Sequence, residues 1–515
     1  MNGYYSITED DGKALMRIYD GVKHTEVSEE FILPDYLPDV KRIIKMEARP
    51  KIDGKYVTLG KLDYEGDVIC HILFCDEGNH LKSVTFTVSF ADGLEIEGIE
   101  DECVASLISE PESVSCKMLN PRRVSIRMRV DTALTVWCRR SFVPELSGAV
   151  CGSEEKSRNV DVMKLVCAGE SGLNVSCDLE ADGALPQIGE IISSSFDMSF
   201  YECKGSEGKV LCRGELVSTI FYSSNEGDSE EYTVLFRRLP VAQVVSAEGV
   251  DENYSCMARG YVDGSKISVA ENGFGERRIA MLDITYRIYL NCVGKTTVKV
   301  TEDIYAIGGD VRIEKRKEMF CKLSKLYQTS FGATLALPRE ELDMSGAENV
   351  FSVTADPEIT EVTLAEDGKR LKVKGVSKNS SIVRTAEGLV SHEYELPFSV
   401  ELDGGGIGKD YIYNYDIVCL GAKGRFDSEK FYTELELQLN LMVLETEEID
   451  VLTKAEFSEN EAPAERSAMR FYYPSEGETL WDVGKAFGIP TELIAEKNSI
   501  KDGALPSVVY IPYAN

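Results

Sequence analysis

The amino-acid sequence predicts a mainly β protein: three tandem β-rich, sandwich-like repeat domains, followed by a small α/β module of the order strand–helix–helix–strand. Three observations support this prediction. Several segments alternate apolar and polar residues, similar landmarks recur along the chain, and the composition changes sharply after residue 456.

Alternation with a period of two identifies the strands. Residues 83–90, SVTFTVSF, place valine and phenylalanine on one side and serine and threonine on the other. Residues 431–443, FYTELELQLNLMV, place leucine, valine and phenylalanine on one side, with tyrosine, glutamate, glutamine and asparagine opposite. This pattern is typical of half-buried strands in antiparallel sheets, whose apolar face needs a second layer to cover it. We therefore expect two-layer sandwiches or open barrels.

Landmarks recur at matching offsets in the first two repeats. In both, a glycine inside a strand-like run lies 28 residues after a Leu-Pro dipeptide, and an Arg-Arg pair begins 15 residues before a later strand position. The landmarks are Leu37-Pro38, Gly66, Arg122-Arg123 and Trp137 in the first repeat, and Leu185-Pro186, Gly214, Arg277-Arg278 and Cys292 in the second. A divergent third copy begins at Leu337-Pro338 and has its glycine, Gly375, 37 residues further on.

The apolar residues after each Leu-Pro dipeptide predict a short helical element of one or two turns. They are Val40, Ile43 and Ile44 in the first repeat, and Ile188, Ile191 and Ile192 in the second. The Arg-Arg pairs are interpreted as the exposed start of a strand, and binding to an acidic partner is the alternative.

These landmarks predict the domain boundaries. The three repeat domains are expected at residues 1–150, 151–308 and 309–456. Residues 457–467 are acidic and carry alanine and proline, which predicts a mobile linker. The small module then occupies residues 468–515.

The charge balance excludes several classes of function. The chain has 56 basic and 88 acidic residues, a net charge of −32, which argues against a nucleic-acid partner because phosphates attract basic surfaces. No run approaches 18 apolar residues, and the first residues do not resemble a signal peptide. We therefore expect a cytoplasmic protein with no transmembrane segment.

Cysteine and histidine usage predicts no metal site. The 14 cysteines contain no C-x-x-C pair, and the four histidines are scattered. The cysteines are expected to be reduced thiols. No spacing identifies a nucleophile with its base or an acid–base pair, so the sequence predicts no catalytic residue, no cofactor and no enzyme activity.

The C-terminal module has clear local signals for its elements. Residues 471–473 and 508–511 are expected to be strands, with Pro512 stopping the second. The first helix carries apolar residues at Leu480, Val483 and Phe487. The expected caps and stops are Thr479 and Gly488 for the first helix, and Thr491 and Asn498 for the second.

The segment GETLWDVGKAFGIPTELIAEKN, followed by YIP, resembles the LysM module. In that family a shallow groove between two loops binds chains that contain N-acetylglucosamine. The matching positions here are Gly477, Glu478, Thr479, Asn498, Ser499 and Ile500. Turn and cap formation alone explains the glycine, threonine and asparagine equally well. Among the departures from the family pattern, Gly484 stands where the helix usually has alanine, at a cost of about 1 kcal/mol.

The motif LPDYLPDVKRII precedes a β-rich unit that is repeated and then followed by this module. This arrangement resembles the SPOCS-domain family of spore-forming clostridia. The resemblance implies a non-enzymatic scaffold of spore coat assembly, located in the mother-cell cytoplasm and recruited to the forespore surface. It also implies that the LysM module binds a coat morphogenetic protein, a SpoIVA-like ATPase, and that the repeats bind other coat proteins.

A second hypothesis belongs to another functional class. The LysM module could bind peptidoglycan, in a protein that acts at the spore cortex or cell wall. The lack of a recognisable export signal counts against this reading, because the glycan lies across a membrane.

Overall fold

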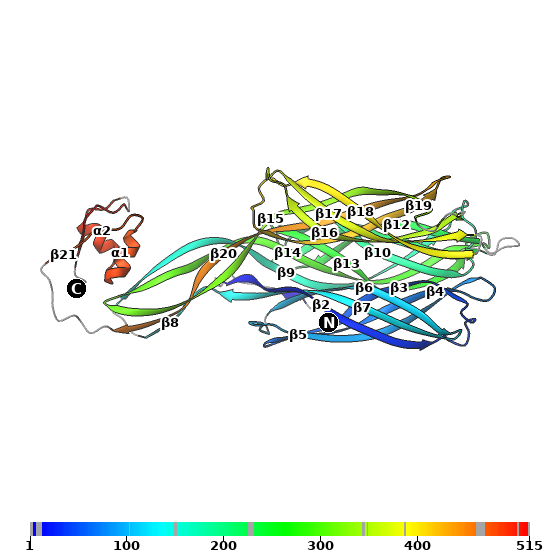
Figure 1. The fold of residues 1–515 in the computed structure, drawn as a ribbon, viewed down its shortest axis with the longest axis horizontal. Helices are drawn as coiled ribbons and strands as arrows, with labels where there is room; N and C mark the ends of the chain where they lie inside the picture. The colour runs from blue at the N-terminus through cyan, green and yellow to red at the C-terminus, as the bar shows by residue number, and fades with distance from the viewer. Residues whose placement is uncertain are drawn as a thin grey trace.

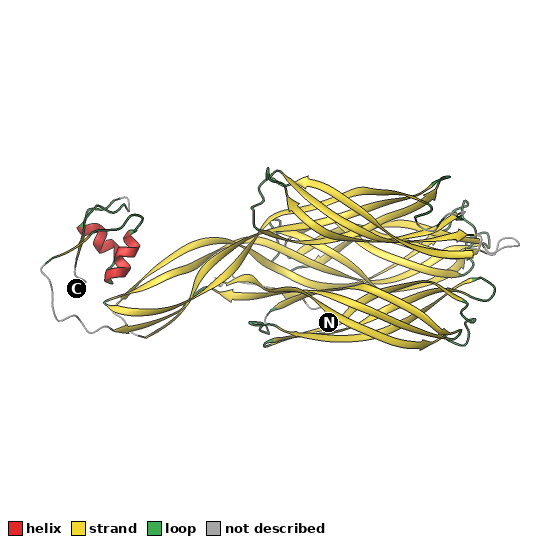
Figure 2. Ribbon diagram, viewed as in Figure 1, coloured by secondary structure: helices red, strands yellow, loops and turns green. Residues whose placement is uncertain are grey.

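The structure is a computed structural model, and it is mainly β, as the sequence predicts (Figures 1 and 2). It describes residues 4–6, 13–101, 103–148, 152–224, 231–341, 344, 346–347, 349–385, 388–459, 469–501 and 504–512. Among these residues, no helix has both the length and the apolar character needed to cross a membrane.

Eighteen of the strands fall into three sets of six. The first set, here called unit 1, is β2 (Lys13–Ile32), β3 (Arg42–Thr58), β4 (Lys61–Cys75), β5 (Leu81–Glu95), β6 (Val104–Asn120) and β7 (Arg123–Ser141). Unit 2 is β9 (Gly152–Glu180), β10 (Ile191–Ser206), β11 (Lys209–Ser224), β12 (Glu231–Ser246), β13 (Ser255–Glu271) and β14 (Arg277–Ile307). Unit 3 is β15 (Gly309–Pro338), β16 (Asn349–Leu364), β17 (Arg370–Thr385), β18 (Gly388–Asp403), β19 (Tyr411–Phe426) and β20 (Lys430–Glu459).

The same strand order occurs in each unit. The first, sixth and fifth strands form one antiparallel sheet, and the second, third and fourth strands form another; in unit 1 these sheets are β2-β7-β6 and β3-β4-β5. In unit 2 the pair Lys204–Ser255 joins the two sheets, and β1 (Tyr4–Ser6) adds to the edge of β9. Each unit encloses its own apolar core.

The repeated glycine has the same structural reason in all three units. Gly66, Gly214 and Gly375 each pair with the residue just before a β-bulge in the second strand of the unit. A Cβ at these glycines would overlap a carbonyl oxygen of that neighbouring strand. A side chain is therefore excluded where the bulge brings the two backbones together.

Two apolar clusters join the three units to one another. One of them combines Leu73, Cys75 and Leu81 of unit 1, Ile192, Phe221 and Tyr232 of unit 2, and Ile382 and Leu389 of unit 3. The other includes Trp137 of unit 1, Val293 of unit 2 and Leu444 of unit 3. An ion pair with a buried carboxylate also crosses between units, since Arg259 Nε of β13 lies 3.0 Å from Asp416 Oδ1 of β19.

This packing between units corrects two expectations. The prediction of helical turns after the Leu-Pro dipeptides was wrong, because Ile43 and Ile44 lie in β3 and Ile191 and Ile192 lie in β10. Consecutive isoleucines occur there because one faces its own unit's core and the next faces the other units.

The polar side of residues 431–443 is also not uniformly exposed. Gln438 and Asn440 are buried, and Asn440 Nδ2 donates to the Phe200 carbonyl of unit 2 at 2.7 Å. The face that the alternation pattern assigned to solvent therefore packs on another unit in this part of β20. By contrast, Val84, Val88 and Phe90 face the core of unit 1, as expected for residues 83–90.

The Leu-Pro dipeptides of units 1 and 2 lie in the loop between the first two strands of each unit, and an arginine of each pair forms hydrogen bonds to that loop. The Arg122 guanidinium donates to the carbonyls of Leu33, Pro34 and Leu37, and Arg278 donates to Ala181, Asp182 and Leu185. Arg122 therefore corresponds to Arg278, one residue away from the expected match with Arg277. The dipeptide Leu337-Pro338 is not a counterpart of the other two, because it forms the last two residues of β15, where Pro338 pairs with Lys430.

Cysteine chemistry differs from the expectation at one place. The structure joins Cys103, which directly precedes β6, to Cys138 of β7 by a disulfide. Ten other described cysteines carry free thiols.

Four long strands form a projection that reaches the C-terminal module (Figure 1). Strands β9, β14, β15 and β20 have 29, 31, 30 and 30 residues. Their far segments, residues 152–163, 296–307, 309–323 and 445–459, are here called the stem. The β9–β14 and β15–β20 ribbons pack through apolar residues such as Val160, Val300 and Leu452. Strand β8 (Glu145–Gly148) pairs in parallel with β20.

The C-terminal module consists of β21 (Arg470–Tyr472), α1 (Leu480–Phe487), α2 (Thr491–Lys497) and β22 (Val509–Ile511). Strands β21 and β22 pair antiparallel, and Val483, Ile489, Ile494, Val509 and Ile511 form the buried core beneath the helices. The expected linker begins too early, because residues 457–459 still belong to β20. Residues 460–467 lie outside the described residues.

Candidate binding surface of the C-terminal module

Helix α1 begins and ends as its sequence predicts. The Thr479 hydroxyl accepts from the Asp482 backbone N–H, and the Asp482 carboxylate accepts from the Thr479 backbone N–H at 2.8 Å. Gly488 ends the helix with a φ of 61°, in the left-handed region that glycine adopts without strain. The module's local sequence therefore determines where α1 begins and ends.

One side of α1 is bound to the stem through Asp303 of β14. Its carboxylate accepts from Lys485 Nζ at 2.6 and 2.8 Å and from Trp481 Nε1 at 3.1 Å. Burial alone would raise the pKa of Asp303, but the hydrogen bonds from Lys485 and Trp481 outweigh it and lower the pKa. The Asp303 side chain is therefore an anionic anchor for the module.

Helix α2 receives its N-terminal cap from the stem. We expected Thr491 to be the capping residue, but Pro490 holds the N-cap position and makes no side-chain hydrogen bond. The Glu154 carboxylate of β9 takes that role: it accepts from the Thr491 backbone N–H at 2.9 Å and from its hydroxyl at 2.8 Å. A carboxylate at a helix N-terminus satisfies free N–H groups and is stabilised by the helix dipole.

Tyr305 of β14 fills the space between the two helices and the stem. The Tyr305 hydroxyl oxygen lies within hydrogen-bonding distance of two acceptors, Glu154 Oε2 at 2.6 Å and the Ile489 carbonyl oxygen at 2.8 Å. The Tyr305 ring packs edge to face against the Trp481 ring. Burial and the hydrogen bond to Glu154 raise the pKa of Tyr305, so the hydroxyl stays protonated.

This contact explains why Gly484 departs from the LysM pattern. A Cβ at Gly484 would lie 2.6 Å from the Tyr305 hydroxyl oxygen. The glycine that costs helix propensity therefore lets the stem approach α1 closely.

The first loop of the predicted groove consists of Gly477, Glu478 and Thr479. Gly477 has a φ of 88° and is exposed. Glu478 accepts from the Tyr472 hydroxyl at 2.8 Å and from the Ser475 backbone N–H at 2.8 Å. The Glu478 carboxylate and the Thr479 hydroxyl are thus engaged inside the module.

The second loop consists of Asn498, Ser499 and Ile500. The Asn498 amide donates to the carbonyls of Ile494 and Tyr510 and accepts from the Tyr510 backbone N–H at 2.7 Å. Ser499 is exposed and has a φ of 55°. Across the two loops, Gly477, Thr479 and Ser499 are exposed, and Glu478, Asn498 and Ile500 are half-buried.

The outer face of the β21–β22 ribbon is a surface that sequence reasoning missed. Met469, Phe471 and Tyr473 are 66%, 57% and 73% exposed, and Phe471 packs beside Tyr510 of the paired strand. Tyr472 faces the module core, so the residues on either side of it in the strand face outward. This period-two alternation was the sequence signal that could have identified the surface. This set of side chains, here called the ribbon face, offers apolar and aromatic contact area of the kind that protein interfaces use.

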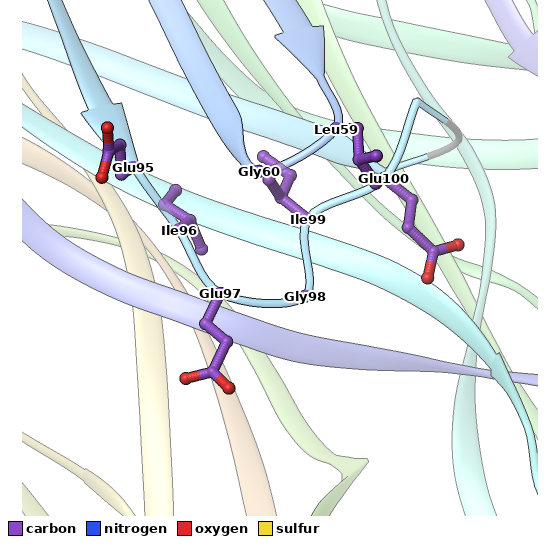
Figure 3. Close-up of a pocket in the computed structure, with 8 residues that line it drawn as sticks. All are labelled: Leu59, Gly60, Glu95, Ile96, Glu97, Gly98, Ile99 and Glu100. Carbon is purple, nitrogen blue, oxygen red and sulfur yellow. The ribbon is translucent and has the colours of Figure 1, made fainter.

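A depression on unit 1 is lined by Leu59, Gly60 and residues 95–100 (Figure 3). The carboxylates of Glu95, Glu97 and Glu100 point away from one another, so they do not converge on a ligand. Its loops are joined by hydrogen bonds between Gly60 and residues 96 and 99, and Gly208 of unit 2 makes the same pair of bonds to residues 247 and 250. The depression is therefore formed by the loops that connect the strands, in an arrangement that recurs in unit 2.

Comparison with known proteins identifies one region. A family model described as SipL, SPOCS domain, matches residues 39–119, which include β3, β4, β5 and nearly all of β6. No curated protein and no solved structure matches the chain.

Proposed function

We propose that this chain, whose residues 39–119 match a SPOCS domain, is a non-enzymatic adaptor in spore coat or envelope assembly. The SPOCS domain indicates a sporulation-related protein. In this proposal the three units are copies of one sandwich-like module, and residues 468–515 are a LysM module. The chain acts in the mother-cell cytoplasm and is recruited to the forespore surface.

The observation that carries the proposal is the threefold recurrence of the matched architecture. Units 2 and 3 have the strand order of the matched unit, and the bulge opposite Gly66 recurs at Gly214 and Gly375. A chain that presents three such units and a separate module offers several docking surfaces, and linked sites raise avidity.

We assign the coat ATPase, a SpoIVA-like protein, to the C-terminal module and other coat proteins to the β units. The side of α1 that carries Trp481 and Lys485 already contacts the stem. The ribbon face and the exposed residues of the two groove loops are candidate contact surfaces of the module. We place the ATPase contact on the ribbon face, because Phe471 and Tyr473 supply exposed aromatic area.

The test is co-elution of the full chain with a purified coat ATPase of this class in size-exclusion chromatography. The double substitution F471S/Y473S should abolish co-elution. F274S is the matched control, since Phe274 is 90% exposed but lies in the β13–β14 turn, away from the module. Co-elution that survives F471S/Y473S would contradict this assignment of the ribbon face.

The peptidoglycan hypothesis gives a different result with the same proteins. Sedimentation with insoluble peptidoglycan, competed by soluble chitooligosaccharide, would indicate glycan binding at the groove loops. We expect no such sedimentation, because Glu478 and Asn498 already bond within the module.

A further inference from the structure

Cys203 and Cys212 face each other in the β10–β11 hairpin of unit 2. The strand register pairs them directly, three residues before and after the Ser206–Lys209 pair that closes the turn. The turn residues, Glu207 and Gly208, have φ values of 33° and 76°. Two positive φ values are characteristic of a two-residue type I′ hairpin turn.

The turn fixes which kind of pair the two cysteines form. The residues that close a two-residue hairpin turn exchange both backbone hydrogen bonds, and the two kinds of pair alternate from there. Counting away from Ser206 and Lys209 makes Cys203 and Cys212 a non-hydrogen-bonded pair, in which Cα atoms lie about 4.5 Å apart and side chains are closest. The disulfide-bonded residues Cys103 and Cys138 have a Cα separation of 4.3 Å, so this chain already bridges two strands at that spacing.

The two thiols differ in their access to solvent. Cys203 is half-buried, whereas Cys212 has no exposed surface. Hydrogen bonding with Cys212, followed by burial, raises the pKa of the Cys203 thiol. Its partial exposure lets an oxidant reach Cys203 before Cys212. The raised pKa leaves little Cys203 thiolate at neutral pH, so the reaction is slow there and becomes faster as the pH rises.

We propose that Cys203 and Cys212 form a reversible disulfide when the protein meets a small disulfide oxidant of the glutathione disulfide class. The Cys203 thiolate attacks one sulfur of the oxidant, which forms a mixed disulfide and releases one glutathione thiolate. The Cys212 thiolate then attacks Cys203 Sγ, which closes the Cys203–Cys212 bond and releases the second glutathione. The two protons lost by the cysteines pass to the two glutathione thiolates, and the oxidant takes up both electrons.

The position of this bond gives it a structural consequence. Lys204, next to Cys203, makes the pair with Ser255 that joins the two sheets of unit 2. A disulfide at Cys203 fixes β10 to β11 at the point where the sheets meet. Unit 2 also supplies half of the stem, so the bond stabilises the unit on which the C-terminal module rests. This inference is independent of the proposed function.

The test uses the full chain, reduced and then freed of reductant. It is incubated with glutathione disulfide at pH 7 and at pH 9, its remaining thiols are alkylated, and its peptides are mapped by mass spectrometry without reduction. We expect a Cys203–Cys212 linked peptide that forms faster at pH 9. In C212S, we expect glutathione to stay attached to Cys203. In C203S, Cys212 should remain unmodified because it is buried.

C419S is the matched control, since Cys419 is also half-buried but pairs with Leu437 and has no cysteine opposite. It should give the same Cys203–Cys212 link as the unmodified chain. Circular dichroism of each variant confirms the native fold before oxidation. Linkage of Cys203 to Cys256, or a Cys203 that stays unmodified in folded chain at both pH values, would overturn the proposal.

Discussion

Glu154 of β9 caps helix α2 through the backbone N–H of Thr491, which follows it by 337 residues in the chain (N···Oε1 2.9 Å). The same carboxylate accepts from the Thr491 hydroxyl and bonds with Tyr305. The stem thus supplies a contact that the module's own sequence leaves out, because Pro490 has no side-chain acceptor.

Removing this cap should release the module from the stem. E154A leaves the Thr491 backbone N–H and hydroxyl without their acceptor and removes one of the two acceptors of the Tyr305 hydroxyl, which costs about 1–3 kcal/mol. We expect faster hydrogen exchange at residues 491–494 and a red shift of Trp481 fluorescence. D161A is the control, because Asp161 is also on β9 but its carboxylate bonds only to neighbouring Thr297 in the described part of the chain. Unchanged exchange at α2 in E154A would show that the cap does not hold the module.

Adding one methyl group at Gly484 should have opposite local and global effects. Alanine favours the helix by about 1 kcal/mol, yet its Cβ would sit 2.6 Å from the Tyr305 hydroxyl oxygen. We expect G484A to weaken docking, detected by faster hydrogen exchange at Tyr305 and residues 488–491. Y305F removes the obstructing oxygen, so the G484A/Y305F double variant should recover part of the loss. Additive losses in this double-mutant cycle would disprove the steric explanation.

The glycines opposite the bulges should resist substitution. In G214A the new Cβ would overlap the Ser199 carbonyl, which forces the bulge open and destabilises the protein by roughly 1–3 kcal/mol or more. G264A is the control, since Gly264 also lies beside a bulge but has open space around its Cβ position. Urea unfolding should show a lower midpoint for G214A alone, and equal midpoints for both variants would refute the argument.

Asp356 of β16 should make stability depend on pH. Burial raises its pKa to about 6, and the nearby Glu110, Asp197 and Glu358 carboxylates add to the effect, while Lys378 opposes it. Because the folded pKa exceeds that of the unfolded chain, this residue stabilises the fold at pH values below about 4 and loses that contribution as the pH rises to about 6. D356N should therefore raise the melting temperature at pH 7.5 and flatten its decline between pH 4 and 6. A decline of unchanged slope in D356N would assign the pH dependence to other groups.

The sequence predicted the elements of the module well, because local rules determine them. Thr479 caps α1, Gly488 ends it, and Asn498 ends α2, and each depends on residues a few positions away. Local rules failed at Thr491, where the cap comes from a strand more than 300 residues earlier. They also failed at the isoleucines of β3 and β10, where burial on both sides removes the alternation that marks a strand.

The candidate site was only partly accessible to sequence reasoning. The positions of Gly477 and Asn498 as turn and cap residues follow from their types, and the structure confirms both local roles. The ribbon face was hidden, because Phe471 and Tyr472 look alike in sequence and only the fold shows which of them faces solvent. The docking contacts were hidden for another reason, since Asp303 and Trp481 meet only after long strands from two sheets have formed.

The stem separates the C-terminal module from the bodies of the three units. At about 3.3 Å per residue, residues 445–459 reach on the order of 50 Å, and paired ribbons resist bending more than a single chain segment would. A protein held by the module and a protein held by the units would be kept at a set distance and could not touch unless they are large. Shortening both ribbons by matched pairs of residues would bring the two partners closer while leaving each docking surface unchanged, so the length of these four strands sets the geometry of any assembly built on the chain.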